Sequence, residues 1–578
     1  MGKTAAPPAK HRSTRPPSKC AEGLPVVAVV ATVAGERRDV DISIIGPHRR
    51  ERTGIQSLPN DVLLLILVNV GVRDVLALRK TCKQLRDLSR TRWLWLYFLK
   101  GRVIDQGLPV PGKDVNLSAL SDRDLEARVL RASKFHENWC SPHPAARRRV
   151  EFDAYRTIVD DSAEAHKPTV RHVCFLPGHN GELLITVVGR IITCWEVPLD
   201  CGDVYRVAEW VCDVHPEQVI VNDDPKAVAV LAFVANSSVE EPAPHICALS
   251  LDTFHGRFER CAMLKGPIDT LVPLHAMHGD CVIFSDPLKT WLTSSPMEVR
   301  THKASGSETW ERGNSVLAVK VIGRYLLVVR ATTFEMGLAP TFNNMRVANA
   351  GAMAVFMTSD LVASEAAIVV RSTSLDSHRL EWPTEPVTVL TRVSSDEIDI
   401  VHQMDLFPSA RTSGAPHKTL GSQEKRHPFP FTRPAACGRA VLVAPSCRDL
   451  LVGPSGKGFW AETRNVSQRR SVHPARCLVG FHLTRDDKLQ SQSQEGMMVA
   501  TEVDGLQKSA QRWAEKDWAA TSEGNTLHLC GDALYARRCD MSEIMWKRYM
   551  VASTALEDTM GRLAIGDRNG RVEVLDFA

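Results

Sequence analysis

The sequence lacks the cysteine spacings that mark zinc sites and disulfide frameworks. Its fifteen cysteines are an odd number, stand singly between Cys20 and Cys539, and include no C-x-x-C pair. Thiols placed in this way are typical of reduced, mostly buried cysteines in a cytosolic or nuclear protein. We therefore expect neither a metal site nor a regular set of disulfides.

The sequence also lacks a long apolar run and a strong charge imbalance. No stretch reaches the roughly 18 apolar residues needed to cross a bilayer. The apolar run at 24–34 follows a long polar, Pro-rich lead, which disfavours a signal peptide. A net charge of +4 over 578 residues gives no reason to expect nucleic acid or a membrane as the partner. The cytosol or the nucleus is the expected location.

Catalytic motifs are missing as well. G-x-S-x-G is absent, and so is a G-x-G-x-x-G at a strand-to-helix turn. Residues 136–140 begin like a zinc-protease helix but lack the second histidine. Residues 453–458, Gly-Pro-Ser-Gly-Lys-Gly, lack the spacing of a phosphate loop, and a hairpin turn explains them. We predict no catalytic residue, no cofactor and no metal.

Residues 1–54 are rich in proline and basic residues. They hold ten Lys and Arg against five Asp and Glu and have no helical periodicity. This composition predicts a disordered basic leader. A nuclear-import or phosphate-attracting tail is the functional alternative.

In contrast to these missing motifs, the segment 58–99 has a specific pattern. Its residue order predicts three short helices. Pro59 suits a first helical turn, and the stripe that follows ends at Gly71. A second helix can be capped by Asp74 and a third by Thr91. Three helices of this length bury too little surface to be stable alone, so we expect part of their apolar surface to be shared.

The second of these helices has one apolar face and one basic face. Its basic residues are expected to face water. They are Arg79, Lys80, Lys83 and Arg86.

The order of residues in this segment is Leu-Pro-x-Asp, Ile-Leu, an Asp before a second apolar helix, Thr-Cys-Lys, Leu-Ser and a Trp-Leu-Trp cluster. That order resembles the F-box. The resemblance implies docking onto a Skp-type adaptor and, through it, onto a cullin-RING ubiquitin ligase. A helical corner without a partner is the structural alternative. The residues expected to face the adaptor are Leu58, Pro59, Ile66, Leu67, Leu76, Leu78, Cys82, Leu85 and Trp95.

A fourth helix is predicted after a loop that begins at Gly101. Ser121 and Asp124 have capping-box spacing. An apolar stripe follows at gaps of four, three, three and four, and prolines 142 and 144 end the helix. Such a stripe is typical of packing, so the helix is expected to fix the first unit against the next. Its residues are Leu125, Val129, Ala132, Phe135 and Trp139.

The pattern changes from helical to β-type at about residue 147. From there on, short β-type runs alternate with Gly, Asp, Asn and Pro. Gly178-His179 precedes a hairpin, 183–187 and 191–197, that closes on Trp195-Glu196, and this arrangement resembles one WD-repeat blade. Residues 563–567 and 571–577 form a second hairpin around Asn569-Gly570, which favours hairpin turn geometry.

Weaker candidate strands lie between these two hairpins. Their pitch predicts six to eight four-stranded blades, with seven preferred. They are 227–234 with 246–251, 281–285 with 290–292, 315–322 with 324–329, 387–390 with 398–401, 440–444 with 458–462, and 497–502.

One closing contact of the ring is also predictable. The chain ends soon after the third strand of its last blade, which leaves an edge that sheets tend to cover. Residues 149–155 alternate apolar and polar side chains and can supply the missing outer strand. We therefore predict that 149–155 pairs with 571–577.

The expected organisation is multidomain: a small all-α F-box unit followed by an all-β propeller. Its parts are a disordered leader at 1–54, an F-box at 55–100, a loop and linker helix at 101–146, and a propeller at 147–578. Irregular insertions are expected at 334–350, 407–435 and 484–525, and the third could hold a short helix at 506–518.

Three functions are compatible with this organisation. The first is a non-catalytic substrate-recognition subunit of an SCF-type ubiquitin ligase, which binds a Skp-type adaptor through the F-box and a protein substrate through the propeller. The second is an interaction scaffold without ubiquitin transfer, and the third is an enzyme built on the propeller. Related F-box propellers can recognise phosphorylated motifs with clustered arginines, and the candidates here are Arg171, Arg190, Arg206, Arg257 and Arg324.

Overall fold

A computed structural model gives the fold of this chain. It describes residues 54–108, 110, 117–155, 169–200, 202–235, 243–266, 273–286, 288–294, 299–301, 314–339, 354–357, 362–370, 386–394, 399–408, 431, 435–442, 448–468, 471–483, 527–537 and 551–578. The chain divides into two compact units, Met1–Leu58 and Pro59–Ala578. The predicted disordered leader, the strand at 497–502 and the helix at 506–518 lie outside the described residues.

The first unit contributes one described element. This is a single 3-10 turn, η1 (Ile55–Ser57). Its backbone is closed by a hydrogen bond of 2.9 Å from the Ser57 amide to the Gly54 carbonyl. The Ser57 hydroxyl donates to the same carbonyl at 2.8 Å.

The second unit begins with four short helices rather than the three predicted. They are α1 (Asn60–Asn69), α2 (Val72–Leu78), α3 (Lys83–Leu88) and α4 (Arg92–Phe98), and a π-helical turn, η2 (Leu99–Ile104), continues α4. The loop predicted from Gly101 is therefore helical as far as residue 104.

The predicted second helix is split because Cys82 interrupts it. Cys82 has extended backbone angles, φ −151° and ψ 164°, and its Sγ accepts the Leu85 amide at 3.5 Å. A residue in that conformation starts a new helix and ends the old one. At the start of α2, Gly71 takes the capping position that was predicted for Asp74. The Asp74 carboxylate instead accepts the Gly71 amide at 3.2 Å from inside the first turn.

The predicted linker helix is confirmed as α5 (Asp122–Trp139), which a short 3-10 turn, η3 (Leu117–Ala119), precedes. Ser121 and Asp124 form the capping box, with the Asp124 amide donating to the Ser121 hydroxyl at 3.2 Å. All five residues of its predicted stripe are buried.

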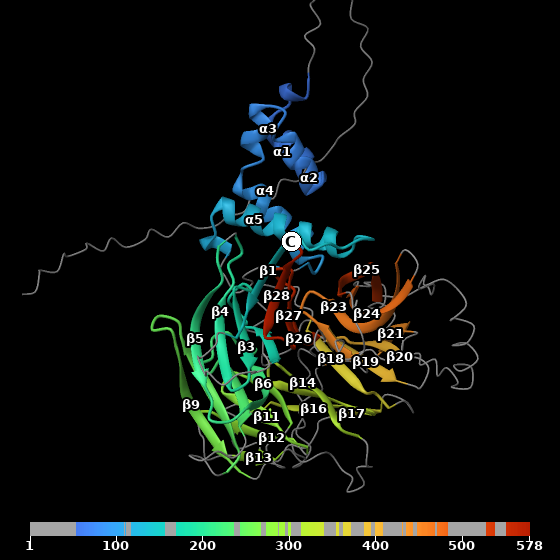
Figure 1. The fold of residues 1–578 in the computed structure, drawn as a ribbon. Coiled ribbons are helices and arrows are strands. Elements are labelled where there is room, and N and C mark those ends of the chain that lie inside the picture. Colours follow the sequence, from blue (N-terminus) through green and yellow to red (C-terminus); the bar gives the residue numbers. More distant parts are fainter. Residues whose placement is uncertain are drawn as a thin grey trace, which may run out of the picture. The chain divides into compact units, whose positions relative to one another are not determined.

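The strands of the second unit form, within the described residues, seven antiparallel sheets of four strands each (Figure 1). The first sheet consists of β2 (Val170–Phe175), β3 (Leu183–Val188), β4 (Ile191–Glu196) and β5 (Tyr205–Val211). The second consists of β6 (Pro216–Val221), β7 (Leu231–Ala235), β8 (His245–Asp252) and β9 (Arg257–Lys265). The third consists of β10 (Leu274–His278), β11 (Cys281–Phe284), β12 (Lys289–Leu292) and β13 (Val299–Thr301).

The fourth sheet consists of β14 (Val316–Ile322), β15 (Tyr325–Arg330), β16 (Thr333–Leu338) and β17 (Ala354–Met357). The fifth consists of β18 (Glu365–Val370), β19 (Val387–Ser394), β20 (Asp399–Leu406) and β21 (Ala435–Leu442). The sixth consists of β22 (Arg448–Val452), β23 (Lys457–Gln468), β24 (Ser471–Leu483) and β25 (Leu527–Arg537). The last sheet consists of β26 (Val551–Glu557), β27 (Arg562–Asp567), β28 (Arg571–Asp576) and β1 (Arg148–Asp153).

From β6 to β26 the first strands of consecutive sheets contact one another, and β2 contacts β26. The first two sheets also contact each other through β5 and β9, so the sheets close into a ring. This arrangement is a β-propeller with the first strand of each sheet on the inside. The predicted closing contact is confirmed, because β1 pairs antiparallel with β28 from Arg148–Asp576 to Asp153–Arg571. Figure 1 shows β1 beside β28, from the two ends of the propeller's sequence.

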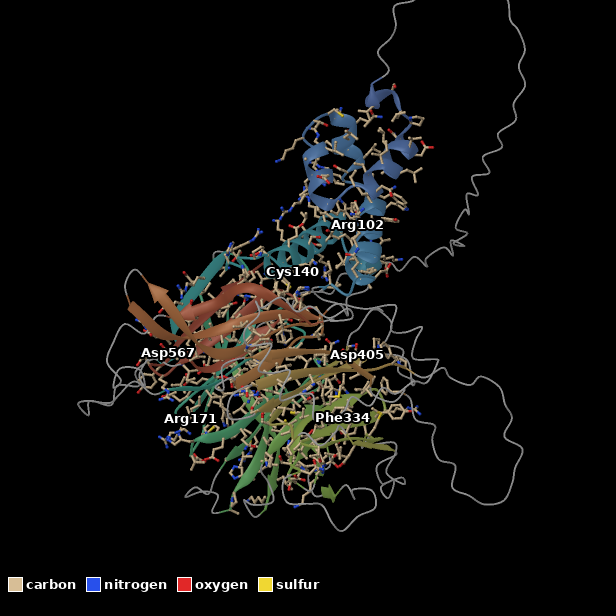
Figure 2. The ribbon with its side chains drawn as sticks, turned by 90° about the vertical axis from the view of Figure 1, so that its right-hand side faces the viewer. Arg102, Cys140, Arg171, Phe334, Asp405 and Asp567 are labelled. Carbon is tan, nitrogen blue, oxygen red and sulfur yellow. The ribbon has the colours of Figure 1, made fainter. Side chains whose placement is uncertain are left out.

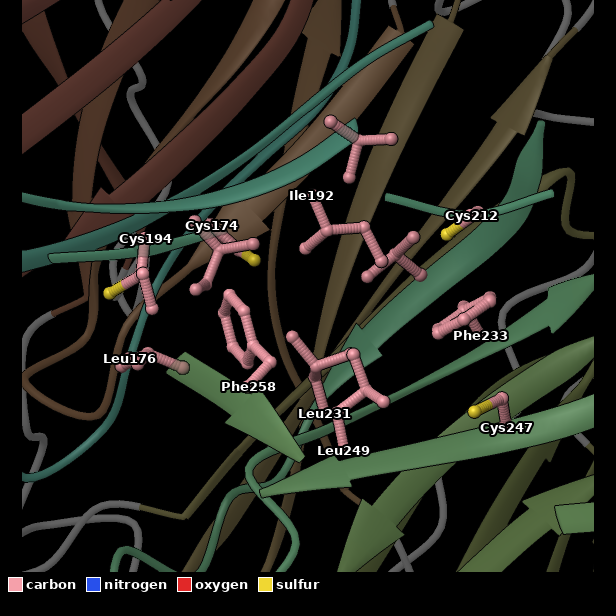
Figure 3. Close-up of a cluster of buried hydrophobic side chains, with 14 of the residues drawn as sticks. Cys174, Leu176, Ile192, Cys194, Cys212, Leu231, Phe233, Cys247, Leu249 and Phe258 are labelled. Carbon is pink, nitrogen blue, oxygen red and sulfur yellow. The ribbon is translucent and has the colours of Figure 1, made fainter. Parts of the chain in front are cut away.

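Apolar side chains that face between neighbouring sheets hold the ring together. Cysteines take part in this packing, as Figure 3 shows for Cys174, Cys194, Cys212 and Cys247. Burial raises the pKa of the last three of these thiols to about 12. They therefore act as small apolar residues and not as nucleophiles.

Most predicted hairpins are confirmed, and one predicted pairing is wrong. The segment at 440–444 was expected to pair with 458–462, but β21 is the outer strand of its sheet and pairs with β20. The partner of β23 is β22, joined to it by a turn in which the Gly453 amide donates to the Lys457 carbonyl at 2.9 Å. The short run at 448–452, which precedes the Gly-rich turn, is the strand that the sequence pattern did not separate.

The three predicted insertions have different outcomes. The first was placed at 334–350, but its beginning belongs to β16, which pairs with β15 and β17. From residue 340 onward that insertion lies outside the described residues, as do all of the one at 484–525 and most of the one at 407–435. Within the last of these, Pro408 and Phe431 form an isolated bridge.

Candidate functional site

The helices α1 and α4 leave large apolar side chains uncovered. In α1, Val62 and Leu65 are 37% and 60% exposed, and in α4, Trp93 and Tyr97 are 51% and 46% exposed. The two aromatic rings of α4 stack with their centroids 5.8 Å apart. We call these four residues the apolar surface of the helices. Exposed apolar side chains of this size on short helices are typical of a protein contact.

The opposite sides of the same helices form their core. Leu63 and Leu67 of α1 are buried, and so are Trp95 and Phe98 of α4, whose rings lie 5.8 Å apart. The Trp95 indole N–H donates to the Ser89 carbonyl at 2.8 Å. The polar end of this tryptophan is therefore satisfied inside the chain.

Arg79 is the main polar link between the short helices and α5. Its guanidinium makes two bonds to the Glu126 carboxylate, 2.6 and 3.0 Å long, and donates to the Ser89 hydroxyl at 2.9 Å. It also lies 5.6 Å from the centre of the Trp95 ring. The expectation that Arg79 faces water is wrong, because a partly buried carboxylate on α5 binds it in two places.

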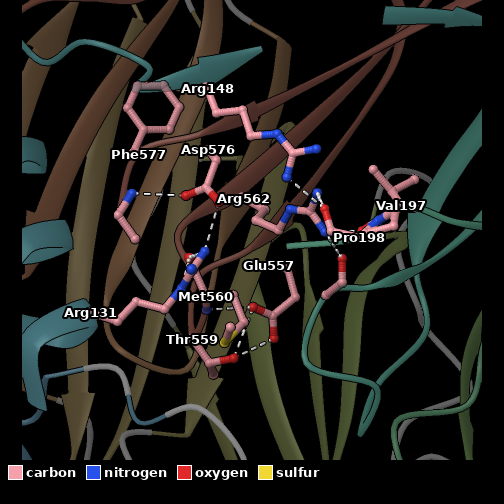
Figure 4. A network of polar contacts seen from close by, with 12 residues as sticks. Arg131, Arg148, Val197, Pro198, Glu557, Thr559, Met560, Arg562, Asp576 and Phe577 are labelled. Carbon is pink, nitrogen blue, oxygen red and sulfur yellow. Dashed lines mark hydrogen bonds and ion pairs between the residues drawn. The ribbon is translucent and has the colours of Figure 1, made fainter. Parts of the chain in front are cut away.

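A second arginine joins α5 to the propeller. The Arg131 guanidinium donates to the Met560 carbonyl at 2.9 Å and pairs with the Asp576 carboxylate at 2.8 Å (Figure 4). Asn138 adds a bond of 2.7 Å to the Phe577 carbonyl. The helix therefore binds the turn before β27 and the end of β28, the strand that also closes the ring.

Aromatic packing reinforces this joint. Trp139 donates its indole N–H to the Phe481 carbonyl at 3.0 Å, and its ring lies 5.4 Å from that of Phe577. Phe135 packs so closely on Gly561 that a Cβ at residue 561 would lie 2.6 Å from its ring. Gly561 has φ +71°, so both its conformation and this contact require glycine.

A buried carboxyl group lies beneath the joint. The Asp558 side chain is 1% exposed, and one of its oxygens accepts the Ser455 amide at 2.6 Å. The other oxygen has no hydrogen-bond partner among the described residues. Burial raises the pKa of this carboxyl to about 7, and the charge of Glu557 adds to the rise. Asp558 therefore changes its protonation near neutral pH.

A histidine on α5 faces the same region. Burial, with a smaller effect from Lys457, lowers the pKa of His136 to about 4, so its imidazole is neutral at physiological pH. The Lys457 ammonium lies 5.3 Å from the centre of the Phe135 ring. The zinc-protease interpretation of 136–140, already disfavoured by the missing second histidine, gains nothing here. No group of three or more His, Cys, Asp or Glu side chains in the described part of the chain can hold a metal ion.

The propeller has a depression at the start of its inner strands. It has a volume of about 290 Å³ and is lined by Arg171 and His172 of β2, Val187 of β3 and residues 216–219 of β6. The inner strands all run in one direction through the ring, and α5 binds at the turns that follow β22 and β26. The depression therefore opens on the face opposite α5, and Figure 2 shows Arg171 well away from Cys140 at the end of α5.

A polar cluster on the other face of the propeller joins three sheets. Asp223, which follows β6, bonds to the His278 imidazole at 2.5 Å and to the Lys320 ammonium at 2.6 Å. The bond to Asp223 raises the pKa of His278. Since these groups satisfy one another across neighbouring sheets, the cluster is explained by packing of the ring.

The five arginines proposed to recognise phosphate do not form one cluster. Arg171 lines the depression, whereas Arg324 lies in the turn after an inner strand and so at the opposite face. Arg190 donates to the Asp213 carbonyl at 3.1 Å, and Arg206 and Arg257 pair with glutamates in their own outer strands. Only Arg171 among these five is placed at the depression.

Comparison with known families bears on the helices. Residues 55–97 match the family model of the F-box domain. The chain carries an F-box domain. F-box domains generally bind Skp-type adaptors of SCF-type complexes.

Comparison with solved structures finds low similarity over a large part of the chain. One match is the C-terminal WD40 domain of Sif2, with 8% identity, 71% of this chain and 97% of that chain covered, and a TM-score of 0.36. Another is a humanized mutant of the Chaetomium thermophilum Polycomb Repressive Complex 2, with 11% identity, coverage of 75% and 97%, and a TM-score of 0.36. The propeller assignment rests on the strand order and on the contacts between the sheets. A search of curated proteins finds no match.

The residues predicted to face the adaptor differ in how deeply they are buried. Leu67, Leu85 and Trp95 are buried in the helices' own packing. Pro59 is exposed, and Leu58 belongs to the first unit, where it is half-buried. The remaining residues are half-buried: Ile66, Leu76, Leu78 and Cys82.

The apolar surface of the F-box was not predicted residue by residue. The signal was present as apolar residues off the buried stripe, because Leu65 lies between Leu63 and Leu67 and Trp93 and Tyr97 are spaced one turn apart. A buried face needs only one apolar stripe. Additional apolar residues beyond that stripe indicate a second contact.

Proposed function

We propose that this chain is a non-catalytic substrate-recognition subunit of an SCF-type ubiquitin ligase. Its F-box would bind a Skp-type adaptor and its propeller a protein substrate. The observation that supports this proposal is the match of residues 55–97 to the F-box domain on helices that expose Leu65 and Trp93. The nine residues predicted from the sequence remain part of the proposed contact. Those that are exposed would touch the adaptor directly, and those that are buried would hold the contacting helices in place.

The joint at α5 gives the proposed subunit its geometry. Arg79 ties the F-box helices to Glu126 on α5, and Arg131 and Trp139 tie the same helix to the propeller. A substrate held by the propeller would thus be kept at a defined distance from the adaptor. The contribution to ubiquitin transfer is proximity, because a fixed geometry raises the effective concentration of the acceptor lysine.

The depression at Arg171 is the proposed substrate contact on the propeller. It opens on the face away from α5, so a bound substrate would not compete with the joint. Its lining combines a guanidinium, the carboxylate of Glu217 and the amide of Gln218, whose φ of +46° is unusual for a residue other than glycine. Mixed charges of this kind fit a polypeptide segment better than a uniformly charged ligand.

A cytosolic or nuclear location is part of the proposal. Eight described cysteines are free thiols and five of them are buried, which suits a reducing compartment. Among the helices that the structure describes, none has the length and apolarity needed to span a membrane.

The test is recovery of an endogenous cullin with the tagged full-length chain. Leu65→Glu places a charge in the apolar surface without touching the buried core, and we expect it to abolish recovery of the adaptor and the cullin. Phe254→Glu is the matched control, because Phe254 is an 89% exposed apolar residue of the propeller. Equal recovery with both variants would contradict the proposed docking surface.

The alternative is an interaction scaffold that binds an adaptor without ubiquitin transfer. The same experiment separates the two when it is followed by ubiquitination of proteins that co-purify with the chain. A scaffold would recover the adaptor but no cullin-dependent ubiquitin conjugates. No cofactor is expected in the purified protein under either function, which absorbance spectra and metal analysis would check.

A further inference from the structure

The basic residues of the F-box region fall into two groups. Arginines of the first group bind inside the fold. Arg79 binds Glu126, Arg92 donates to the Leu117 carbonyl at 2.7 Å, and Arg102 donates to the Val68 carbonyl at 2.9 Å. These side chains satisfy helix ends and hold the helices to α5.

The second group has no such role. Its members are exposed, and three of them form no ion pair with any described residue, while Arg86 lies 3.9 Å from the Asp87 carboxylate. Positions 83, 86 and 90 are three and four residues apart, so they lie on one side of α3 and the turn after it. We call this group the basic face: Lys80, Lys83, Arg86 and Arg90.

The helix that carries half of the basic face, α3, adjoins α1. The Gln84 amide donates to the Asn60 side-chain oxygen at 3.0 Å, which ties the start of α3 to the start of α1. On α1, Val62 and Leu65 are exposed. Apolar groups beside positive charges fit a protein surface with an apolar centre and an acidic rim. A nucleic acid backbone would leave the apolar side chains uncovered.

We infer that the basic face docks against acidic residues of the adaptor and steers its association with this chain. This inference rests on the proposed function, since it assigns a chemistry to the adaptor's surface. Lys80, Lys83, Arg86 and Arg90 are exposed charges that salt screens, so they act mainly on the rate of encounter. The apolar surface then retains the adaptor after it has docked.

The test measures association of the full-length chain with a purified Skp-type adaptor over a series of salt concentrations. A variant carries Lys80→Glu, Lys83→Glu, Arg86→Glu and Arg90→Glu. A matched control carries the same charge change at exposed basic residues elsewhere: Arg123→Glu, Lys134→Glu, Lys226→Glu and Arg260→Glu. At low salt we expect the variant's association rate to fall by about tenfold or more, with a flatter salt dependence and a nearly unchanged dissociation rate.

The outcomes distinguish the inference from the proposed function. If the wild-type chain binds the adaptor and the variant behaves like the control, the inference is wrong and the proposed function stands. If the wild-type chain does not bind any Skp-type adaptor, the proposed function is wrong. Binding of heparin or RNA that the variant loses, with adaptor association unchanged, would assign the basic face to a polyanion and overturn the inference.

Discussion

The F-box helices and the propeller differ in how completely they bury their own apolar residues. Among the described residues, exposed large apolar side chains gather on α1 and α4 at Val62, Leu65, Trp93 and Tyr97. In the propeller they are dispersed over the sheets and turns, as at Phe254. The larger part encloses its core and the smaller part does not.

This difference follows from size and topology. Each sheet of the propeller has a neighbour on both sides, so both of its faces are covered. Short helices have only one another and the elements they dock on, and small units bury a smaller fraction of their surface. A partner that covers apolar surface is therefore expected at the F-box helices. On the propeller, the rims and the depression are the surfaces left for binding.

The largest expected effect tests whether the joint belongs to the propeller's core. Trp139→Ala should lower the free energy of unfolding by about 3–5 kcal/mol, because it empties a fully buried site. Trp93→Ala, at a half-exposed tryptophan of the F-box, should change it by about 1 kcal/mol or less. Denaturant unfolding of both full-length variants measures the difference, and equal losses would remove the contrast between a buried joint and an exposed surface.

A smaller effect is expected at the polar link between the F-box helices and α5. Arg79→Met removes both bonds to Glu126 and leaves a partly buried carboxylate without its cation, so we expect a loss of about 2 kcal/mol. Arg86→Met, at an exposed arginine, should change the stability by about 0.5 kcal/mol or less. Hydrogen exchange of α2 and α3 would localise the loss. Unchanged protection in the Arg79 variant would show that the bond to Glu126 does not stabilise α2 and α3.

The smallest expected effect is a pH dependence of the propeller. The folded-state pKa of Asp558 is raised to about 7, so its stabilising contribution is fully present below the carboxyl's ordinary pKa and is lost as pH rises through about 7. Between pH 6 and pH 8 the free energy of unfolding should fall by roughly 1 kcal/mol from this group. Asp558→Asn should flatten that fall, whereas Asp87→Asn, at an exposed carboxylate of the F-box, should not. A slope that is unchanged in the Asp558 variant would contradict this assignment.

Local patterns predicted much of the architecture. The α5 stripe, its capping box and the hairpins of the first and last sheets follow from periodicity and turn chemistry, which neighbouring residues alone determine. The pairing of β1 with β28 is long-range, and it was predictable because the last sheet had an uncovered edge. The break at Cys82 was missed because apolar spacing continued across it. The pairing of 440–444 was wrong because an outer strand and an inner strand have the same composition.

The site was harder to predict for a physical reason. Burial in the F-box depends on which helix packs on which, so the sequence did not separate Trp95, a core residue, from Trp93, an exposed one. The pairing of Arg79 with Glu126 joins residues far apart in the sequence. The depression at Arg171 is formed by three strands of two different sheets, and no local motif marks it.

The pairing of β1 with β28 has a consequence for biosynthesis. While the ribosome is still making the sheets in between, residues 148–153 have no strand to pair with, and α5 lacks the carbonyl of Phe577 and the carboxylate of Asp576. The F-box helices have by then emerged, so a nascent chain could meet the proposed adaptor before its propeller closes. A premature stop before Arg571 would leave a protein that still offers the docking helices while its ring stays open. Under the proposed function, such a truncated product would occupy adaptors without delivering a substrate.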